Sequence, residues 1–191
     1  MKKLLLAGAM LLASMTTAFA EPVKVGFIYV GPIGDHGWTY RHDIGRQQVE
    51  EAFGDQVETM YLESVQYGPE AETAIRKMAQ GGADIIFATS FGYMDPMLKV
   101  AKDFPDVKFE HATGYKQSDN MASYGLRLYQ ARHVQGVIAG MMTKTNKICY
   151  VGAYPIPEVI REINTFYMGA KKMDPDVDID IVWVNTWYDP V

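Results

Sequence analysis

The chain has 191 residues, of which 48% are hydrophobic and 21% are charged, and its formal net charge at pH 7 is −5. An acidic chain without a cluster of basic residues argues against nucleic acid or an anionic membrane surface as the main partner. The single cysteine, Cys149, excludes a disulfide within the chain. Because it lies in an apolar run, the sequence predicts a buried structural thiol rather than a nucleophile.

Residues 1–20 have the pattern of a secretory signal peptide. Lys2 and Lys3 precede an apolar run at 4–15, and an A-x-A site ends at Ala20. We expect cleavage after Ala20, with no lipid-bearing cysteine, and export of a soluble protein to the periplasm. The alternative is an uncleaved anchor, although the run is short for a bilayer. Loss of the two lysines leaves 16 basic and 23 acidic residues, a net charge of −7.

The next stretch predicts a strand, a turn and a helix. Residues 23–30 are mostly apolar, residues 31–34 read GPIG, and a helix is expected at about 36–53 with Asp35 as its N-cap. The expected apolar stripe of this helix comprises Trp38, Ile44, Val49, Ala52 and Phe53. Ligands of open α/β sheets bind at the carboxyl ends of strands, so Asp35 and Trp38 are candidate ligand contacts. The glycine spacing G-x-x-G-x-x-G differs from the dinucleotide fingerprint, and no nicotinamide or flavin site is predicted.

Strands and helices then alternate. Strands are expected at 57–62, 83–88, 107–111 and 122–128, and helices at 69–80 and from 95 to before Pro105. The expected buried face of the first of these helices comprises Ala71, Ala74, Ile75, Met78 and Ala79. This order predicts an α/β fold with a doubly wound parallel sheet. Ser90, Phe91 and Asp95 follow a strand at the same edge and are further candidate ligand contacts; a helix cap is the simpler interpretation of Asp95.

The alternation restarts in the last third of the chain. Helices are expected at 130–143 and 157–173, and strands at 147–151 and 180–185. Two strands do not make a stable sheet. We therefore expect an N-terminal lobe at 21–126, an incomplete second lobe at 127–191, a longer whole protein, and an open cleft. Tyr154 and Glu158 are candidate cleft residues of the second lobe.

No catalytic, metal or cofactor motif is predicted. Aspartates alternate at 174–180 like a calcium loop, but Ile179 and Asn185 occupy the positions where glycine and glutamate are needed. A solvated loop is the better interpretation. The four histidines have no metal-ligand spacing, and no nucleophile elbow, zinc motif or phosphate loop is present in the sequence.

Several short segments together resemble the basic membrane protein family of ABC-transporter substrate-binding proteins, the purine-nucleoside receptor group. They are KVGF at 24–27, GDHGWT at 34–39, GADII at 82–86, AKDFPDVKF at 101–109, GVIAG at 136–140, KICYVG at 147–152 and NTWYD at 185–189. The resemblance lies in their order and spacing and covers the whole chain after the signal peptide. It implies two Rossmann-like lobes of the type I periplasmic-binding-protein kind, joined by a hinge.

The resemblance also implies a ligand, often a purine nucleoside, between two aromatic side chains. Where the family shows D-x-S-F-N, this chain has DHGWT at 35–39, so Trp38 would stack on the base and Thr39 would supply a polar contact. The family's S-F-x-D pattern matches TWYD at 186–189, which makes Trp187 the second aromatic face. Both positions hold a larger ring than the family's phenylalanine.

The expected function is therefore that of an exported, monomeric solute-binding protein that delivers a purine base or nucleoside to an ABC permease. Hinge closure around the ligand would be the mechanism. Two alternatives stay open. A periplasmic sensor module for a receptor has the same sequence features. A nucleoside-processing enzyme would need a metal cluster or an acid/base pair, and the sequence indicates neither.

Overall fold

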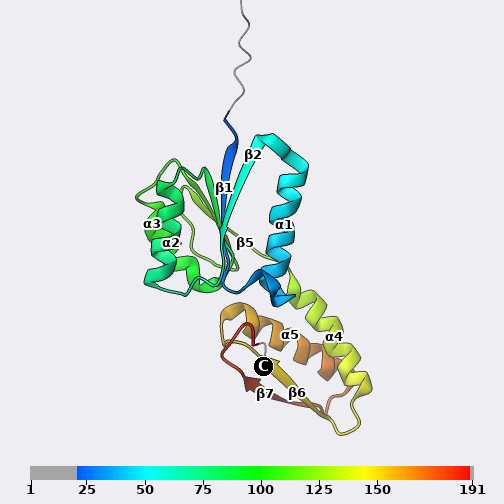
Figure 1. Cartoon of the computed structure of the whole chain (residues 1–191). Coiled ribbons are helices and arrows are strands. Elements are labelled where there is room, and N and C mark those ends of the chain that lie inside the picture. The colour runs from blue at the N-terminus through cyan, green and yellow to red at the C-terminus, as the bar shows by residue number, and fades with distance from the viewer. Residues whose placement is uncertain (1–20, 190–191) are drawn as a thin grey trace, which may run out of the picture.

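A computed structural model describes residues 21–189; the predicted signal peptide lies outside the described residues. Five parallel strands form the first sheet, in the order β2-β1-β3-β4-β5. They are β1 (Val23–Ile28), β2 (Val57–Leu62), β3 (Ile85–Ala88), β4 (Lys108–Ala112) and β5 (Met121–Tyr124). Figure 1 shows α1 (Trp38–Phe53) on one face of this sheet and α2 (Pro69–Gln80) with α3 (Met94–Ala101) on the other. The predicted doubly wound parallel sheet is confirmed.

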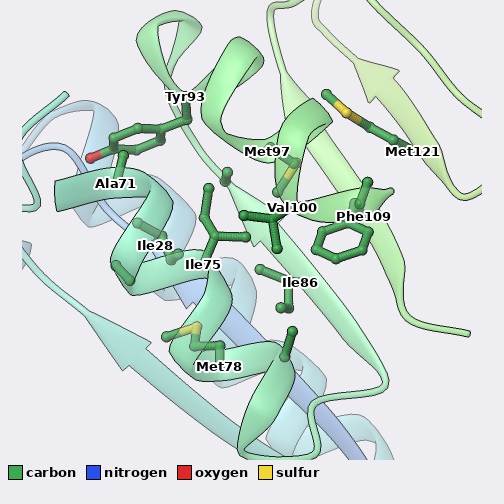
Figure 2. Close-up of a cluster of buried hydrophobic side chains, with 14 of the residues drawn as sticks. Ile28, Ala71, Ile75, Met78, Ile86, Tyr93, Met97, Val100, Phe109 and Met121 are labelled. Carbon is green, nitrogen blue, oxygen red and sulfur yellow. The ribbon is translucent and has the colours of Figure 1, made fainter. Parts of the chain in front are cut away.

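The larger hydrophobic core lies between this sheet and the helices α2 and α3. Figure 2 shows Ile75 of α2 and Val100 of α3 close to Ile86 of β3. All five positions predicted as the inner face of α2 are buried. Gly26 permits close packing, because a Cβ there would lie 2.7 Å from the sulfur of Met78. The apolar helical period therefore located this core correctly.

The opposite face of the sheet is more polar than predicted. The buried residues of α1 are Thr39, Asp43 and Arg46, and the predicted apolar stripe ends in the exposed Phe53, so that prediction is wrong. The Arg46 Nε donates to Asp43 at 2.7 Å, and its guanidinium lies 4.8 Å from the ring centre of Tyr61 on β2. An ion pair can be buried when its hydrogen bonds are satisfied. The prediction missed this pair because helix periodicity was read from apolar residues alone.

The second sheet has two parallel strands, β6 (Lys147–Gly152) and β7 (Asp178–Trp183). The helices α4 (Leu128–Met142) and α5 (Pro157–Met173) pack against each other beside it (Figure 1). Their backbones approach closely: a Cβ on Gly136 would lie 1.9 Å from the carbonyl oxygen of Phe166, and one on Gly169 would lie 2.2 Å from that of His133. Glycine is required at this crossing because any larger residue would overlap the facing helix.

Several local expectations are wrong, and α1, β3 and α4 also begin two residues away from the expected starts at 36, 83 and 130. β5 begins at Met121 and ends at Tyr124 rather than spanning 122–128, and β7 begins two residues before the predicted start at 180. Cys149 is exposed rather than buried. Side chains alternate across a strand, and Cys149 lies on the face of β6 opposite to Ile148 and Tyr150, which are half-buried. An apolar run in sequence does not say which of its residues face the helices.

No helix within residues 21–189 combines the length and the apolar character needed to span a bilayer.

Candidate ligand-binding site between the two sheets

The site begins where the strand order of the first sheet reverses. β1 pairs with β2 on one side and with β3 on the other, so the carboxyl ends of β1 and β3 flank a topological switch point. Trp38, the first residue of α1, reaches across this point: its indole Nε1 donates to the carbonyl oxygen of Thr89 at 2.5 Å. The hydrogen bond fixes the half-buried indole at the end of β3.

Asp35 caps the helix that carries Trp38. Its carboxylate accepts hydrogen bonds from the backbone N–H groups of Gly37 at 2.7 Å, Thr39 at 3.0 Å and Tyr40 at 3.0 Å. The N-cap position itself belongs to Gly37, so Asp35 acts from outside the helix, at the end of a short 3-10 turn. The predicted N-cap position and helix start are therefore wrong, although the Asp35 carboxylate does accept N–H groups at the start of α1. Direct contact between Asp35 and a ligand stays a prediction.

Thr39 supports the loop after β1. Its side chain is fully buried, and its hydroxyl oxygen accepts the N–H of Gly31 at 3.2 Å. Together with the cap from Asp35, this bond sets the path of the loop between β1 and α1. In this conformation Thr39 positions its neighbours, and its predicted polar contact with a ligand is untested.

Tyr67, in the loop before α2, links the two parts of the chain and was missed by sequence reasoning. Its hydroxyl lies 2.7 Å from Ser90 Oγ and accepts a hydrogen bond of 2.7 Å from the indole Nε1 of Trp187. Burial raises the pKa of this phenol above its usual value. Only a weak signal for Tyr67 exists in the sequence, namely an aromatic residue just before the Pro69 that starts a helix.

Trp187 comes from the segment after β7, and its ring centre lies 5.1 Å from that of Tyr154, which follows β6. Trp38 and Trp187 line the same cavity. The residues around it are Val30, Trp38, Ser90, Phe91, Thr113, Ile156, Glu158 and Trp187. Five predicted residues, the two tryptophans with Ser90, Phe91 and Glu158, are therefore brought together, although they are up to 149 positions apart in the sequence.

The cavity is small and mostly apolar. Its volume is about 80 Å³, whereas pockets that enclose small-molecule ligands usually measure roughly 300–1,000 Å³. The two parts of the chain are in contact through Tyr67 and Trp187, so the expected open cleft is not observed. A contact between aromatic side chains closes the cleft even though the second sheet has only two strands.

Glu158 is the charged residue of the cavity, at the second position of α5. Burial raises the pKa of its carboxyl, and the nearby Glu162 acts in the same direction. Arg161 and a hydrogen bond with Thr113 act in the opposite direction. Thr113 follows β4, so the two parts of the chain meet at this cavity through Thr113 and Glu158 as well.

Asp95 lies outside this cavity. It is the second residue of α3, which begins at Met94, so neither the predicted helix start nor the N-cap is correct. Its carboxylate forms an exposed ion pair of 2.6 Å with Lys116. Within residues 21–189, no group of three or more histidine, cysteine or acidic side chains is arranged to hold a metal ion.

The doubly wound sheet, the second parallel sheet and the cavity between them define a fold of the type I periplasmic-binding-protein kind. The chain belongs to the family described as ABC transporter substrate-binding protein PnrA-like (Bmp), which matches residues 22–191. The chain is 56% identical over 170 residues to a purine-binding protein of Brucella abortus, a match that covers 89% of this chain and 49% of the relative. It is 46% identical to a putative ABC transporter glucose-binding protein of Haloferax volcanii, covering 89% of this chain and 43% of that protein.

Solved structures agree on the fold. An ABC transporter solute-binding protein from Aeropyrum pernix superposes with a TM-score of 0.76 at 23% identity, over 88% of this chain and 49% of that one. A solute-binding protein from Conexibacter woesei gives 0.64 at 22% identity, over 87% and 56%. The chain thus spans about half the length of the curated relatives named above.

Proposed function

We propose that the whole protein is an exported solute-binding protein that captures a purine base or nucleoside and passes it to an ABC permease. Residues 21–126 and 127–191 belong to its two lobes. The observation that carries this proposal is the meeting of Trp38 and Trp187, from different lobes, at one apolar cavity. Indole rings suit a flat heterocycle, because stacking of a base on an aromatic ring contributes about 1–3 kcal/mol.

Lobe closure is the mechanism. A ligand that contacts both tryptophans makes its full set of contacts only when the lobes are together, so it shifts the population towards the closed state. The volume of about 80 Å³ is too small for a nucleoside, and the lobes must therefore separate to admit one. The Tyr67–Trp187 hydrogen bond joins the two lobes beside this cavity.

The ligand is uncharged or cationic. The described residues that line the cavity include Glu158 but neither lysine nor arginine. A phosphate group would need a cation or free backbone N–H groups, and Asp35 already occupies three N–H groups at the start of α1. The protein therefore takes up bases or nucleosides rather than nucleotides.

A sugar is the second candidate ligand, because a relative that is 46% identical is named as a putative glucose-binding protein. Aromatic side chains also pack against the apolar C–H faces of sugar rings. The 56% identity to a purine-binding protein and the presence of indoles on both sides of the cavity favour the purine.

Titration of the full-length protein decides between these ligands. Tryptophan fluorescence is followed while adenine, adenosine, guanosine, inosine or glucose is added. We expect saturable quenching by at least one purine and none by glucose. Quenching by glucose alone, or by none of the five, overturns the proposal. Recovery of the purine unchanged after incubation supports binding without turnover, whereas release of free base or ribose indicates an enzyme.

Export and partnership are tested in the producing cell. We expect the mature protein to begin at Glu21 in the periplasmic fraction, to behave as a monomer, and to copurify with membrane permease subunits. Copurification with a receptor instead would favour the sensor function.

A further inference from the structure

Glu158 is the single ionisable side chain among the described residues that line the cavity. It projects from the first turn of α5, and the other lining residues are apolar, aromatic or hydroxyl-bearing. Glu158 is half-buried, so its carboxylate loses part of its hydration, which is costly unless donors replace the water.

The protein supplies only some of the donors that would replace the lost water around Glu158. Thr113 gives the carboxyl one hydrogen bond, and Arg161 gives it a favourable charge interaction, but burial and the neighbouring Glu162 still raise its pKa. Glu162 itself is paired with Arg132 on α4, through a bond of 2.9 Å. An ionised carboxylate has about four acceptor positions, so Glu158 retains unused acceptor capacity next to the tryptophans.

We propose that Glu158 accepts a hydrogen bond from an N–H group of the bound heterocycle and thereby selects rings that carry such a donor. The inference rests on the proposed function and names the feature of the ligand that the site recognises. Stacking on Trp38 and Trp187 is tolerant of ring identity, since every base has a π-face. Discrimination between heterocycles must come from a directional polar group. A ligand without an N–H donor leaves the Glu158 carboxylate unpaired, and this lowers its affinity.

Two matched ligand pairs test this on the full-length protein. Adenosine carries N–H groups and purine riboside carries none; adenine and 9-methylpurine form the corresponding pair of bases. Calorimetric titration gives the dissociation constant of each ligand for the wild type, for Glu158→Leu and for Glu158→Gln. Glu51→Gln is the control, because Glu51 is an exposed residue on the outer side of α1.

Glu158→Leu is expected to weaken binding of the N–H-bearing ligand by about 10- to 100-fold, because a hydrogen bond to a charged acceptor is lost. The partner ligand without N–H groups should bind to Glu158→Leu at least as tightly as to the wild type, because the acceptor that it leaves unpaired is gone. Glu158→Gln keeps one acceptor oxygen at the same position and should lose less than Glu158→Leu. The control should match the wild type.

The outcomes distinguish failure of the proposed function from failure of the role proposed for Glu158. If the wild type binds no member of either pair and none of the purines of the fluorescence titration, the proposed function fails. If the wild type binds but Glu158→Leu weakens both members of a pair equally, or neither, the function stands and the role of Glu158 is overturned. Thermal unfolding shows whether each variant is folded. If Glu158→Leu is not, the comparison is made with Glu158→Gln, which preserves the shape of the side chain.

Discussion

At the scale of single residues, the two tryptophans have different second roles. Trp38 donates its indole N–H within its own lobe, to Thr89, whereas Trp187 donates across the cleft to Tyr67. Phenylalanine keeps an aromatic face but removes the N–H donor. The same substitution at the two positions therefore has different consequences.

Replacing either tryptophan by alanine should weaken ligand binding by about 5- to 150-fold, because stacking worth about 1–3 kcal/mol is lost. Trp187→Phe should lose less than Trp187→Ala and should also loosen closure. Fluorescence or calorimetric titration measures each variant. Retention of full affinity by both alanine variants would show that the ligand binds elsewhere.

His111 gives the fold a pH dependence. Its side chain is fully buried, its Nε2 lies 2.8 Å from the carbonyl oxygen of Ser90, and its Nδ1 has no protein partner among the described residues. Burial lowers the pKa of His111, and burial likewise lowers that of His42. The unfolded chain, with a histidine pKa of about 6.5, binds protons more readily than the folded one.

The contribution of these histidines to the free energy of unfolding should therefore be fully present above about pH 6.5. It should fall as the pH drops below that value. Urea denaturation at pH 7.5 and pH 5.5 measures the difference. His111→Gln should reduce this difference, while His36→Asn, at an exposed position with a positive φ of 53°, should leave it unchanged. An equal pH effect in both variants would remove His111 as the cause.

At the scale of elements, glycine has different structural roles in the helices α4 and α1. In α4, a Cβ on Gly136 would lie 1.9 Å from the carbonyl oxygen of Phe166 on α5. In α1, a Cβ on Gly45 would meet nothing within 4 Å. The first glycine allows two helices to touch, whereas the second only adds flexibility to the unfolded chain.

Gly136→Ala should lower the free energy of unfolding by about 1–3 kcal/mol through overpacking. Gly45→Ala should raise it by roughly 0.5–1 kcal/mol, since alanine is the better helix former. Chemical denaturation of the two variants measures both effects. Effects of the same sign would mean that the α4–α5 contact is looser than the structure indicates.

At the scale of the whole molecule, Tyr67 couples the two lobes. Its hydroxyl joins Ser90 at the end of β3 to Trp187 after β7, across 120 positions between Tyr67 and Trp187. A net hydrogen bond contributes about 0.5–1.5 kcal/mol, which is enough to change the balance between open and closed states severalfold.

Tyr67→Phe should therefore shift the ligand-free protein towards the open state, by about 2- to 12-fold in the ratio of open to closed forms. Small-angle X-ray scattering should show a larger radius of gyration than for the wild type without ligand, and equal radii with ligand. Tyr115→Phe is the control, because Tyr115 is 66% exposed. Equal radii for all three ligand-free proteins would show that the bond does not control closure.

The sequence by itself determined the features that depend on local pattern. The apolar period located the buried face of α2, the proline at its start and the glycines at its end bounded it, and the alternation of strands and helices gave the parallel sheet. Trp38 could be placed at the site because the first turn after a strand has a fixed position in such a sheet.

Only the tertiary structure decided the features that depend on residues far apart in the chain. The buried Asp43–Arg46 pair is possible because Tyr29, just after β1, donates a hydrogen bond to Asp43, and Thr59 of β2 accepts one from Arg46. Tyr67 became a site residue because the fold brings it to Trp187, and Cys149 became exposed because the strand turns it away from the helices. Periodicity describes one element at a time, whereas these outcomes depend on which element packs against which.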